Sequence, residues 1–305
     1  MKKSILTVIS LLLAACLCLC ACGKTAPAPA PVPEATEAPA EESAAPGIPG
    51  SGTEEDPWLV GADDPAAVTV TLYDDMTVWV SGTGAMRDFA SAEERPWNDV
   101  AAHLTGVMVF DGVSHIGSLA FMGAGSASDG FDAGFYSELE SIGERAFDGA
   151  AFASYCILTL PESVTELGAR AFADCALEEL YIDGTPVIAE DAFAGLHTRV
   201  FVRYDGSWDE SNMLPYGGEV EYVYTYALHF TEDYGTDEIT GEGTAYIPEG
   251  ELFEYNAEDY ISDENYVFSH YEVVSGELEL ADPTDPVISA QLTGNVDMVF
   301  VYKHK

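Results

Sequence analysis

The residue types that most often perform chemistry are present in this chain, but their spacing matches no catalytic or metal-binding pattern. The six histidines form neither an H-E-x-x-H motif nor any other pair four residues apart, the spacing at which two zinc ligands share one helix face. There is no G-x-S-x-G sequence and no local signature of a cysteine–histidine nucleophile. The sequence therefore predicts no catalytic residue, no metal site and no cofactor.

Carboxylates dominate the charge of the chain, with 53 Asp and Glu residues against 11 Lys and Arg residues. So many carboxylates leave no pair that stands out for acid–base catalysis. A surface of this charge repels phosphate backbones and anionic lipid headgroups, which argues against nucleic acid as a partner. The excess is also typical of a surface that must stay soluble in an exposed setting.

Residues 1–22 have the pattern of a secretory signal peptide. Two lysines precede an apolar run over residues 5–19, which is too short to span a membrane as a helix, and small residues follow it. The segment closes with the letters LCAC, which resemble the bacterial lipobox, a motif whose last cysteine receives a lipid and becomes the first residue of the mature protein. Cys22 is therefore the predicted lipid attachment site. An LAAC sequence ending at Cys16 also fits, but cleavage there would leave apolar residues exposed.

Residues 23–55 are rich in Pro, Ala and Glu and hold almost no large apolar side chain. Such a segment cannot bury enough surface to offset the entropy of ordering, so we expect a disordered tether. Behind a lipid, the tether would hold a folded domain away from the extracellular side of the bacterial cell membrane, and the lipid would be the contact with that membrane. A cleaved signal without a lipid is the alternative.

A six-residue phrase, apolar–Gly–x–x–Ala–Phe, occurs four times in the middle of the chain. Its copies begin at residues 116, 142, 167 and 188, so successive copies are 26, 25 and 21 residues apart. This spacing lies within the range of about 20–29 residues that is typical of leucine-rich repeats. The fourth copy departs from the phrase, because Ala189 stands where the glycine is expected.

Short alternating segments accompany these copies and predict one β-strand per unit, at residues 107–109, 158–160, 180–182 and 200–202. In each segment the outer two side chains should face the core and the middle one the open face of the sheet. The phenylalanines of the phrase should lie on short helical turns and stack as a spine, formed by Phe121, Phe147, Phe172 and Phe193. A single unit cannot bury its own apolar face, so the units must stack into a solenoid.

The stretch LTLPESVTELGARAFADCALEELYI, residues 158–182, resembles the BspA-like leucine-rich repeats of bacterial surface proteins. Their pattern is L-x-L-P-x-x-(V/L)-x-x-I-G-x-x-A-F-x-x-C-x-x-L. The copy at residue 142 departs from it, because it lacks a clear preceding strand and follows a Gly/Ser/Asp-rich insertion at residues 123–134. The resemblance implies a mainly β fold with short helices, in which residues 101–204 form a short leucine-rich-repeat solenoid.

Two further segments flank the predicted solenoid. Residues 56–100 read as a β-hairpin cap with its turn at Asp74-Asp75 and, including Pro96-Trp97, resemble the N-terminal module often found before these repeats. Residues 220–305 predict a small all-β domain. Within it, residues 240–302 resemble the bacterial repeat related to internalin B-repeats, an accessory of surface proteins with no known chemistry. Cys156 and Cys175 are the only cysteines of the folded part, and whether they form a disulfide stays open.

These features predict a lipid-anchored cell-surface protein that binds a protein or cell-surface ligand and performs no catalysis. The resemblance implies adhesion or recognition, and the middle residues of the four predicted strands would form the ligand face: Met108, Thr159, Tyr181 and Phe201. The alternatives are a non-binding spacer or wall-associated module, and an enzyme whose site the sequence hides. A C-terminal domain folded over this face would instead make these side chains core residues. No oligomeric state is predicted.

Overall fold

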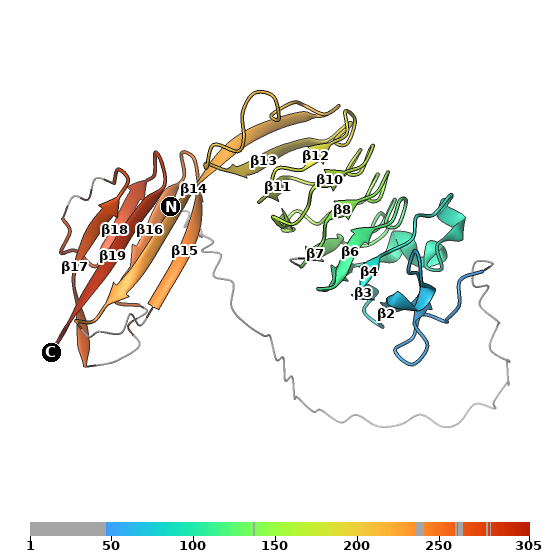
Figure 1. Ribbon diagram of the computed structural model, residues 1–305, viewed down its shortest axis with the longest axis horizontal. Helices are drawn as coiled ribbons and strands as arrows, with labels where there is room; N and C mark the ends of the chain where they lie inside the picture. The colour runs from blue at the N-terminus through green and yellow to red at the C-terminus, as the bar shows by residue number, and fades with distance from the viewer. Residues whose placement is uncertain are drawn as a thin grey trace, which may run out of the picture. The chain divides into compact units, whose positions relative to one another are not determined.

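The computed structural model describes residues 47–136, 138–235, 241–259, 261, 265–278, 280 and 282–305. Cys22, the rest of the predicted signal peptide and most of the predicted tether lie outside these residues. The described part is mainly β, with short 3-10 helices η1 (Pro65–Ala67), η2 (Ala92–Glu94) and η3 (Asn98–His103) (Figure 1). Nowhere in these ranges does a helix reach the length and apolarity needed to cross a membrane.

The first sheet joins the N-terminal cap to the first repeat units. Its order is β1 (Trp58–Leu59), β2 (Val68–Leu72), β3 (Thr77–Gly82), β5 (Gly106–Val109) and β7 (Asp132–Phe135). Strands β2 and β3 form the expected hairpin, with Asp74 and Asp75 in its turn, and β3, β5 and β7 are parallel. Strand β7 is the one that the alternating pattern did not predict, because most of it lies in the insertion at residues 123–134.

A second, parallel sheet lies behind the first and contains β4 (Gly84–Ala85), β6 (Val113–Ile116), β8 (Ser141–Ile142), β10 (Glu166–Leu167) and β12 (Val187–Ile188). The apolar residue that opens each copy of the phrase ends one of these strands. The third sheet has the order β17 (Tyr266–Ser275), β19 (Val296–His304), β14 (Glu219–Asp233), β13 (His197–Arg203), β11 (Glu179–Ile182) and β9 (Leu158–Leu160). Strand β15 (Gly241–Pro248) pairs with β14, and β16 (Leu252–Asn256) pairs with β18 (Val287–Gln291).

The repeated phrase forms tight turns, which corrects the short helical turns expected from the sequence. The third residue after its opening apolar residue is left-handed in three copies: Leu119, Arg145 and Arg170 have φ angles of 64°, 56° and 54°. These turns hydrogen-bond from unit to unit, because the backbone N–H of Phe121 donates to Ala146 O at 2.7 Å and the same bond recurs in the next units. The bonds between units therefore replace those that a helix would form within itself.

The glycine of the phrase is required by the close approach of neighbouring units. A Cβ on Gly143 would lie 2.6 Å from the backbone nitrogen of Ser118, and one on Gly168 would lie 2.7 Å from that of Glu144. Real Cβ contacts of this length essentially do not occur. Glycine recurs in the phrase because, at this position, the backbone of each unit lies too close to the backbone of the preceding unit to leave room for a Cβ.

The predicted phenylalanine spine forms and extends by one ring at each end. Successive ring centroids are 5.8, 5.5, 5.3, 6.4 and 6.1 Å apart along Trp97, Phe121, Phe147, Phe172, Phe193 and Tyr216. The first five of these side chains are fully buried, so the spine forms the centre of the core. Trp97 belongs to the cap, which means that the cap and the units share one core.

The cap closes the first unit with side chains in place of a preceding backbone. The buried guanidinium of Arg95 donates to Leu119 O at 3.0 Å and Met122 O at 2.9 Å, and the Trp97 indole N–H donates to Ala120 O at 2.8 Å. In the later units, the carbonyls equivalent to those of Met122 and Ala120 accept hydrogen bonds from backbone N–H groups of the preceding unit. Burial lowers the pKa of Arg95 to about 10. This value is still well above 7, so the guanidinium is protonated at neutral pH.

The folded part begins before the predicted boundary at residue 56. Ile48 is buried in the core of the cap, Pro49 O accepts a hydrogen bond from Leu59 N at 2.9 Å, and Gly52 O accepts one from Leu72 N at 2.8 Å. Residues 47–55 therefore pack on the cap instead of continuing the tether. A stretch poor in apolar residues is held here by backbone hydrogen bonds.

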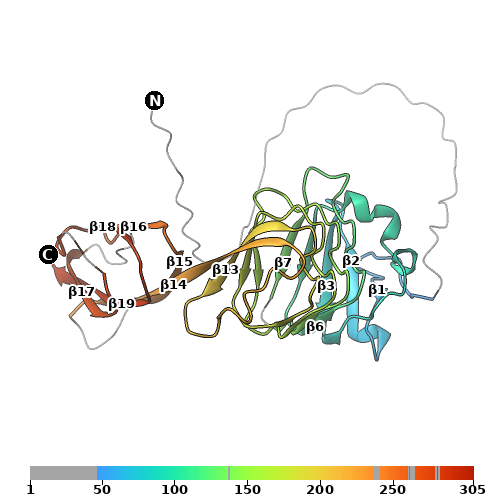
Figure 2. The same ribbon diagram turned by 90° about the horizontal axis from the view of Figure 1, so that it is seen from above.

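The predicted boundary at residue 220 falls inside one continuous strand, β14. Its first half pairs with β13 and packs on the core of the units, and its second half pairs with β15 and β19 in a separate C-terminal core. Figure 2 shows β14 running from the units into the C-terminal strands. The C-terminal domain is thus joined to the last unit through the sheet.

Both cysteines are free thiols with buried side chains. Cys175 donates to Phe147 O at 2.9 Å, and burial raises the pKa of both thiols to about 12. At pH 8 the thiolate fraction would be about one in 10⁴, so we expect neither cysteine to react with iodoacetamide in the native protein. Peptide-resolved mass spectrometry checks this, with the urea-unfolded protein as the reactive control; rapid labelling of the native protein would contradict it.

Candidate functional site

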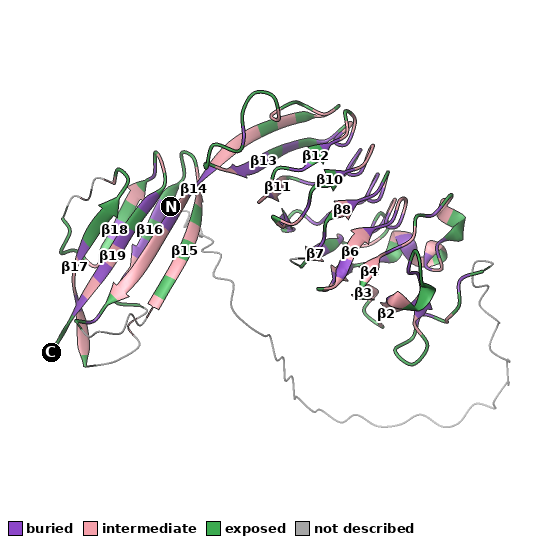
Figure 3. Ribbon diagram, in the orientation of Figure 1, coloured by how far each residue is buried: buried purple, intermediate pink, exposed green. Residues whose placement is uncertain are grey.

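The first and third sheets are the front sheets, and along β3 and β5 the side chains alternate between the core and the open face. In β3 and β5 the valines at 78, 80, 107 and 109 are fully or almost fully buried, and Trp79 and Met108 point outward. Trp79, Met108 and Gly134 lie side by side in register across β3, β5 and β7. Figure 3 shows how far each residue is buried, and a similar alternation of intermediate and exposed residues is visible along β15. The sequence pattern therefore assigned the outward side of β5 correctly.

The four side chains of the predicted ligand face do not form one ladder. Thr159, Tyr181 and Phe201 are in register across β9, β11 and β13, which belong to the third sheet. Met108 belongs to the first sheet, whose last strand β7 is followed by β9 without a ladder of hydrogen bonds among the described residues. The hydrogen-bonded pairing of these strands therefore breaks between β7 and β9.

Phe201 is buried, which removes it from the predicted ligand face. Only 1% of its surface is exposed, because its ring stacks on Tyr181 with centroids 4.4 Å apart and the Arg199 guanidinium lies 5.0 Å above it. Arg199 pairs with Glu179 and lies 3.9 Å from Glu251, which follows β15. The C-terminal domain thus covers this end of the face, as the alternative interpretation of these side chains required.

The neighbouring side chains on the same end are also engaged. Arg203 lies 3.3 Å from Asp183 and stacks over Tyr246 of β15 at 4.7 Å. Tyr181 is half-buried, and burial, with the charges of Glu179 and Glu251, raises its pKa to about 12. The face over β11 and β13 is therefore closed by ion pairs and by the C-terminal domain, and it offers little area to a ligand.

The other end of the face carries an exposed row of aromatic side chains that sequence reasoning missed. Ring centroids are 4.6 Å apart for Tyr73 and Trp79, 5.0 Å for Trp79 and Phe110, and 5.4 Å for Phe110 and Tyr136, the last pair stacked at 9°. Trp79 is 40% and Tyr136 is 42% exposed. We call Tyr73, Trp79, Phe110 and Tyr136 the aromatic row.

The aromatic row follows from the same alternation as the rest of the face. Phe110 is the residue after β5 and Tyr136 the residue after β7, each two positions beyond an outward residue, so both rings project from the open face. Met108 lies beside the row, with its methyl carbon over Gly134, where a Cβ would stand only 2.7 Å away. The sequence pattern covered only three residues per strand, so it did not include Phe110 and Tyr136, which follow the strands.

Three rings of the aromatic row are followed closely in the sequence by a carboxylate, and no basic residue lies on the strands of the row. Asp74, Asp111 and Glu138 are exposed and each follows a ring of the row by one or two residues. Burial, together with a hydrogen bond to Glu54, raises the pKa of Tyr73. The sequences of β2, β3, β5 and β7 contain neither lysine nor arginine. This end of the face is therefore apolar at its centre and negative at its edge.

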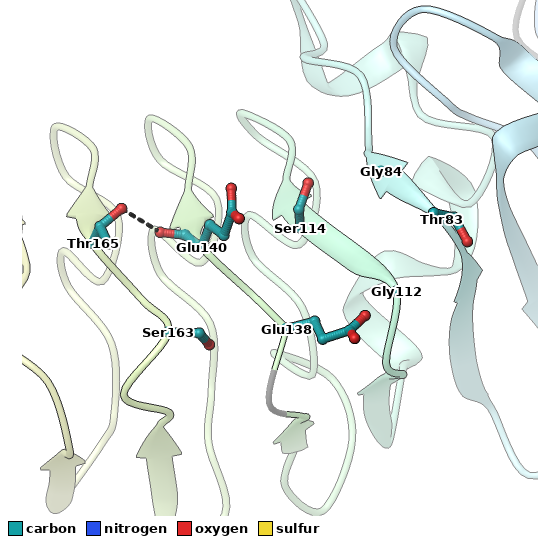
Figure 4. Close-up of a pocket in the computed structure, with 8 residues that line it drawn as sticks. All are labelled: Thr83, Gly84, Gly112, Ser114, Glu138, Glu140, Ser163 and Thr165. Atoms are coloured by element: carbon teal, nitrogen blue, oxygen red, sulfur yellow. Dashed lines mark hydrogen bonds between the residues drawn. The ribbon is translucent and has the colours of Figure 1, made fainter.

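A shallow depression of about 630 Å³ lies beside the row, where the chain passes from the front strands to the second sheet (Figure 4). It is lined by Thr83, Gly84, Gly112, Ser114, Glu138, Glu140, Ser163 and Thr165. Glu138 extends toward Gly112 of the neighbouring unit and lines the depression. No aromatic ring and no buried polar group lines the depression, which leaves the row as the stronger binding feature.

Metal and cofactor sites were not predicted from the sequence. In the described ranges, no three His, Cys, Asp or Glu side chains are grouped so that they could hold a metal ion. Several histidines bond to neighbouring polar side chains, as His115 does to Ser141 at 2.7 Å and to Asp88 at 3.3 Å, and His197 to Glu219 at 3.1 Å.

Comparison with known proteins gives one similar solved structure. Neither a protein-family model nor a curated protein matches the sequence. The crystal structure of a leucine-rich repeat protein from Eubacterium ventriosum is similar to this chain at 21% sequence identity and a TM-score of 0.36. The similarity covers 45% of this chain and 42% of that protein, so this chain spans less than half of that protein's length.

Proposed function

We propose that this chain is a leucine-rich-repeat protein of the bacterial cell surface that binds a protein or cell-surface ligand through its open face. A lipid on Cys22 would anchor it outside the membrane, and the tether would present the folded part to its partner. Recognition, and not catalysis, is the proposed activity. Stacked units with one front strand each support the repeat assignment, because the phrase, the spine and the bonds between units recur together.

The aromatic row is the observation that carries the binding function. Large aromatic side chains on a flat, exposed sheet cost free energy in water unless they meet a partner, and Trp and Tyr concentrate binding energy at interfaces. The row also replaces part of the predicted ligand face: Met108 lies beside it, Thr159 and Tyr181 lie on the third sheet, and Phe201 is buried. A spacer has no use for such a surface.

The double substitution Trp79→Ala/Phe110→Ala tests this proposal. We expect binding of the purified protein to intact neighbouring cells to weaken at least about tenfold, with the melting temperature little changed, because the two rings lie outside the core. The matched control is Val187→Ala/Val274→Ala, which removes two exposed apolar side chains elsewhere. Equal binding by all three proteins would favour the spacer interpretation.

The nature of the ligand can be tested with the same assay. Treating the target cells with a protease before adding the protein should abolish binding if the ligand is a protein. Binding that survives protease treatment and is lost from the aromatic double variant would identify a non-protein ligand on the same face.

A further inference from the structure

The two ends of the open face differ in how their charges are compensated. At the β11–β13 end, Arg199 and Arg203 lie against Glu179 and Asp183, and Arg203 also lies within 3.8 Å of Glu162. At the aromatic end the strands bring no arginine or lysine to the face. The charged residues that follow the rings of this end in the sequence are therefore negative, and the strands themselves supply no positive charge.

Rings and carboxylates in this arrangement share one preferred ligand chemistry. The faces of Trp, Tyr and Phe attract cations within about 6 Å of the ring centroid, and the edge of a carboxylate cluster attracts the same charge. The protein already uses this contact within the same sheet face, since Arg199 lies 5.0 Å above Phe201 and also pairs with Glu179. The aromatic row has both aromatic rings and nearby carboxylates in the sequence, but its own strands contain no such arginine.

We propose that the aromatic row binds a segment of a partner polypeptide that carries lysine and arginine side chains, with these cations over the rings and against the flanking carboxylates. This inference rests on the proposed binding function and specifies the partner's chemistry. The segment crosses the strands along the row, so that several rings are engaged in succession. Electrostatic attraction to the acidic surface speeds the encounter, and the rings determine where the segment lies.

The test uses the full-length protein and two synthetic peptides of equal length, one of repeating Arg-Gly and one of repeating Gln-Gly. The Arg-Gly peptide should bind with an affinity that falls as NaCl increases, and the Gln-Gly peptide should bind at least about tenfold more weakly. Trp79→Ala/Phe110→Ala and Asp74→Asn/Glu138→Gln should each weaken Arg-Gly binding about tenfold. The charge variants neutralise one exposed carboxylate at each end of the row.

The matched control is Glu258→Gln/Glu277→Gln, which changes the net charge equally at two exposed positions of the C-terminal domain. It should alter the affinity less than about twofold. Equal losses in the two charge variants would show that overall charge alone attracts the peptide, and equal binding of both peptides would show that cations are not recognised. If Trp79→Ala/Phe110→Ala abolishes cell binding but Asp74→Asn/Glu138→Gln leaves it intact, the binding function stands and the cationic partner is overturned.

Discussion

Substituting Phe147 by alanine should lower the free energy of unfolding by about 3–5 kcal/mol. Phe147 is fully buried at the middle of the spine, where its ring lies 5.3 Å from Phe172 and 5.5 Å from Phe121. Phe135 and Phe152 also contact it, so its removal would open a cavity lined by four rings. Urea unfolding followed by circular dichroism measures the change.

The matched control for Phe147→Ala is Tyr155→Ala. Tyr155 is an aromatic residue of the same repeat region but is 74% exposed, so its removal should change the free energy of unfolding by less than about 0.5 kcal/mol. A loss below about 1 kcal/mol for Phe147→Ala would show that the units can close the cavity by moving together.

Replacing Arg95 by alanine should destabilise the protein by a similar amount, about 3–5 kcal/mol. Its guanidinium contacts the carbonyls of Leu119 and Met122 and the side chain of Asn98, and it is 4% exposed. Without it, these carbonyls lose a charged donor in a buried place, and no preceding unit supplies another. The loss should appear as fast hydrogen exchange in the first unit as well as in the unfolding curve.

Two control variants test the capping role of Arg95, one for its donors and one for its position. Arg95→Lys keeps the charge but lacks the planar fork of donors, so we expect it to recover only part of the lost stability. Arg87→Ala removes another arginine of the cap, which is partly exposed and lies 5.9 Å over Phe89, and should cost about 1 kcal/mol or less. Equal effects of Arg95→Ala and Arg87→Ala would contradict the capping role.

The fold was predictable where a local pattern repeats. The phrase located the spine, and three-residue alternation located β5, β9, β11 and part of β13, because burial of one strand face imposes a period of two. Strand β7 was missed because its sequence, Asp-Ala-Gly-Phe, has no alternating apolar pair and depends on pairing with β5. Arg95 was missed because a buried arginine has the same local sequence as an exposed one, and only the position of distant carbonyls makes the difference.

Of the four residues of the predicted ligand face, Met108 points outward in the first sheet and Phe201 is buried in the third. Phe201 and Tyr181 have the residue types of an interface, yet their exposure is set by Arg199 and by Glu251, which comes 50 residues after Phe201 in the chain. Phe110 and Tyr136 each follow the last residue of a strand, and the three-residue alternation did not include these positions. Sequence alternation therefore indicated the direction of a side chain, whereas its exposure depended on elements from elsewhere in the fold.

The hydrogen bonds between units also have a consequence for how such a protein changes length in evolution. They run between backbone groups at equivalent places, as from Phe121 to Ala146 and from Phe147 to Ala171, and so do not depend on side-chain identity. A tandem duplication of one interior unit would meet the same donors and acceptors on both sides. The two ends differ from the interior, with the Arg95 closure at one and β14 at the other, so a whole unit added between them leaves both ends unchanged.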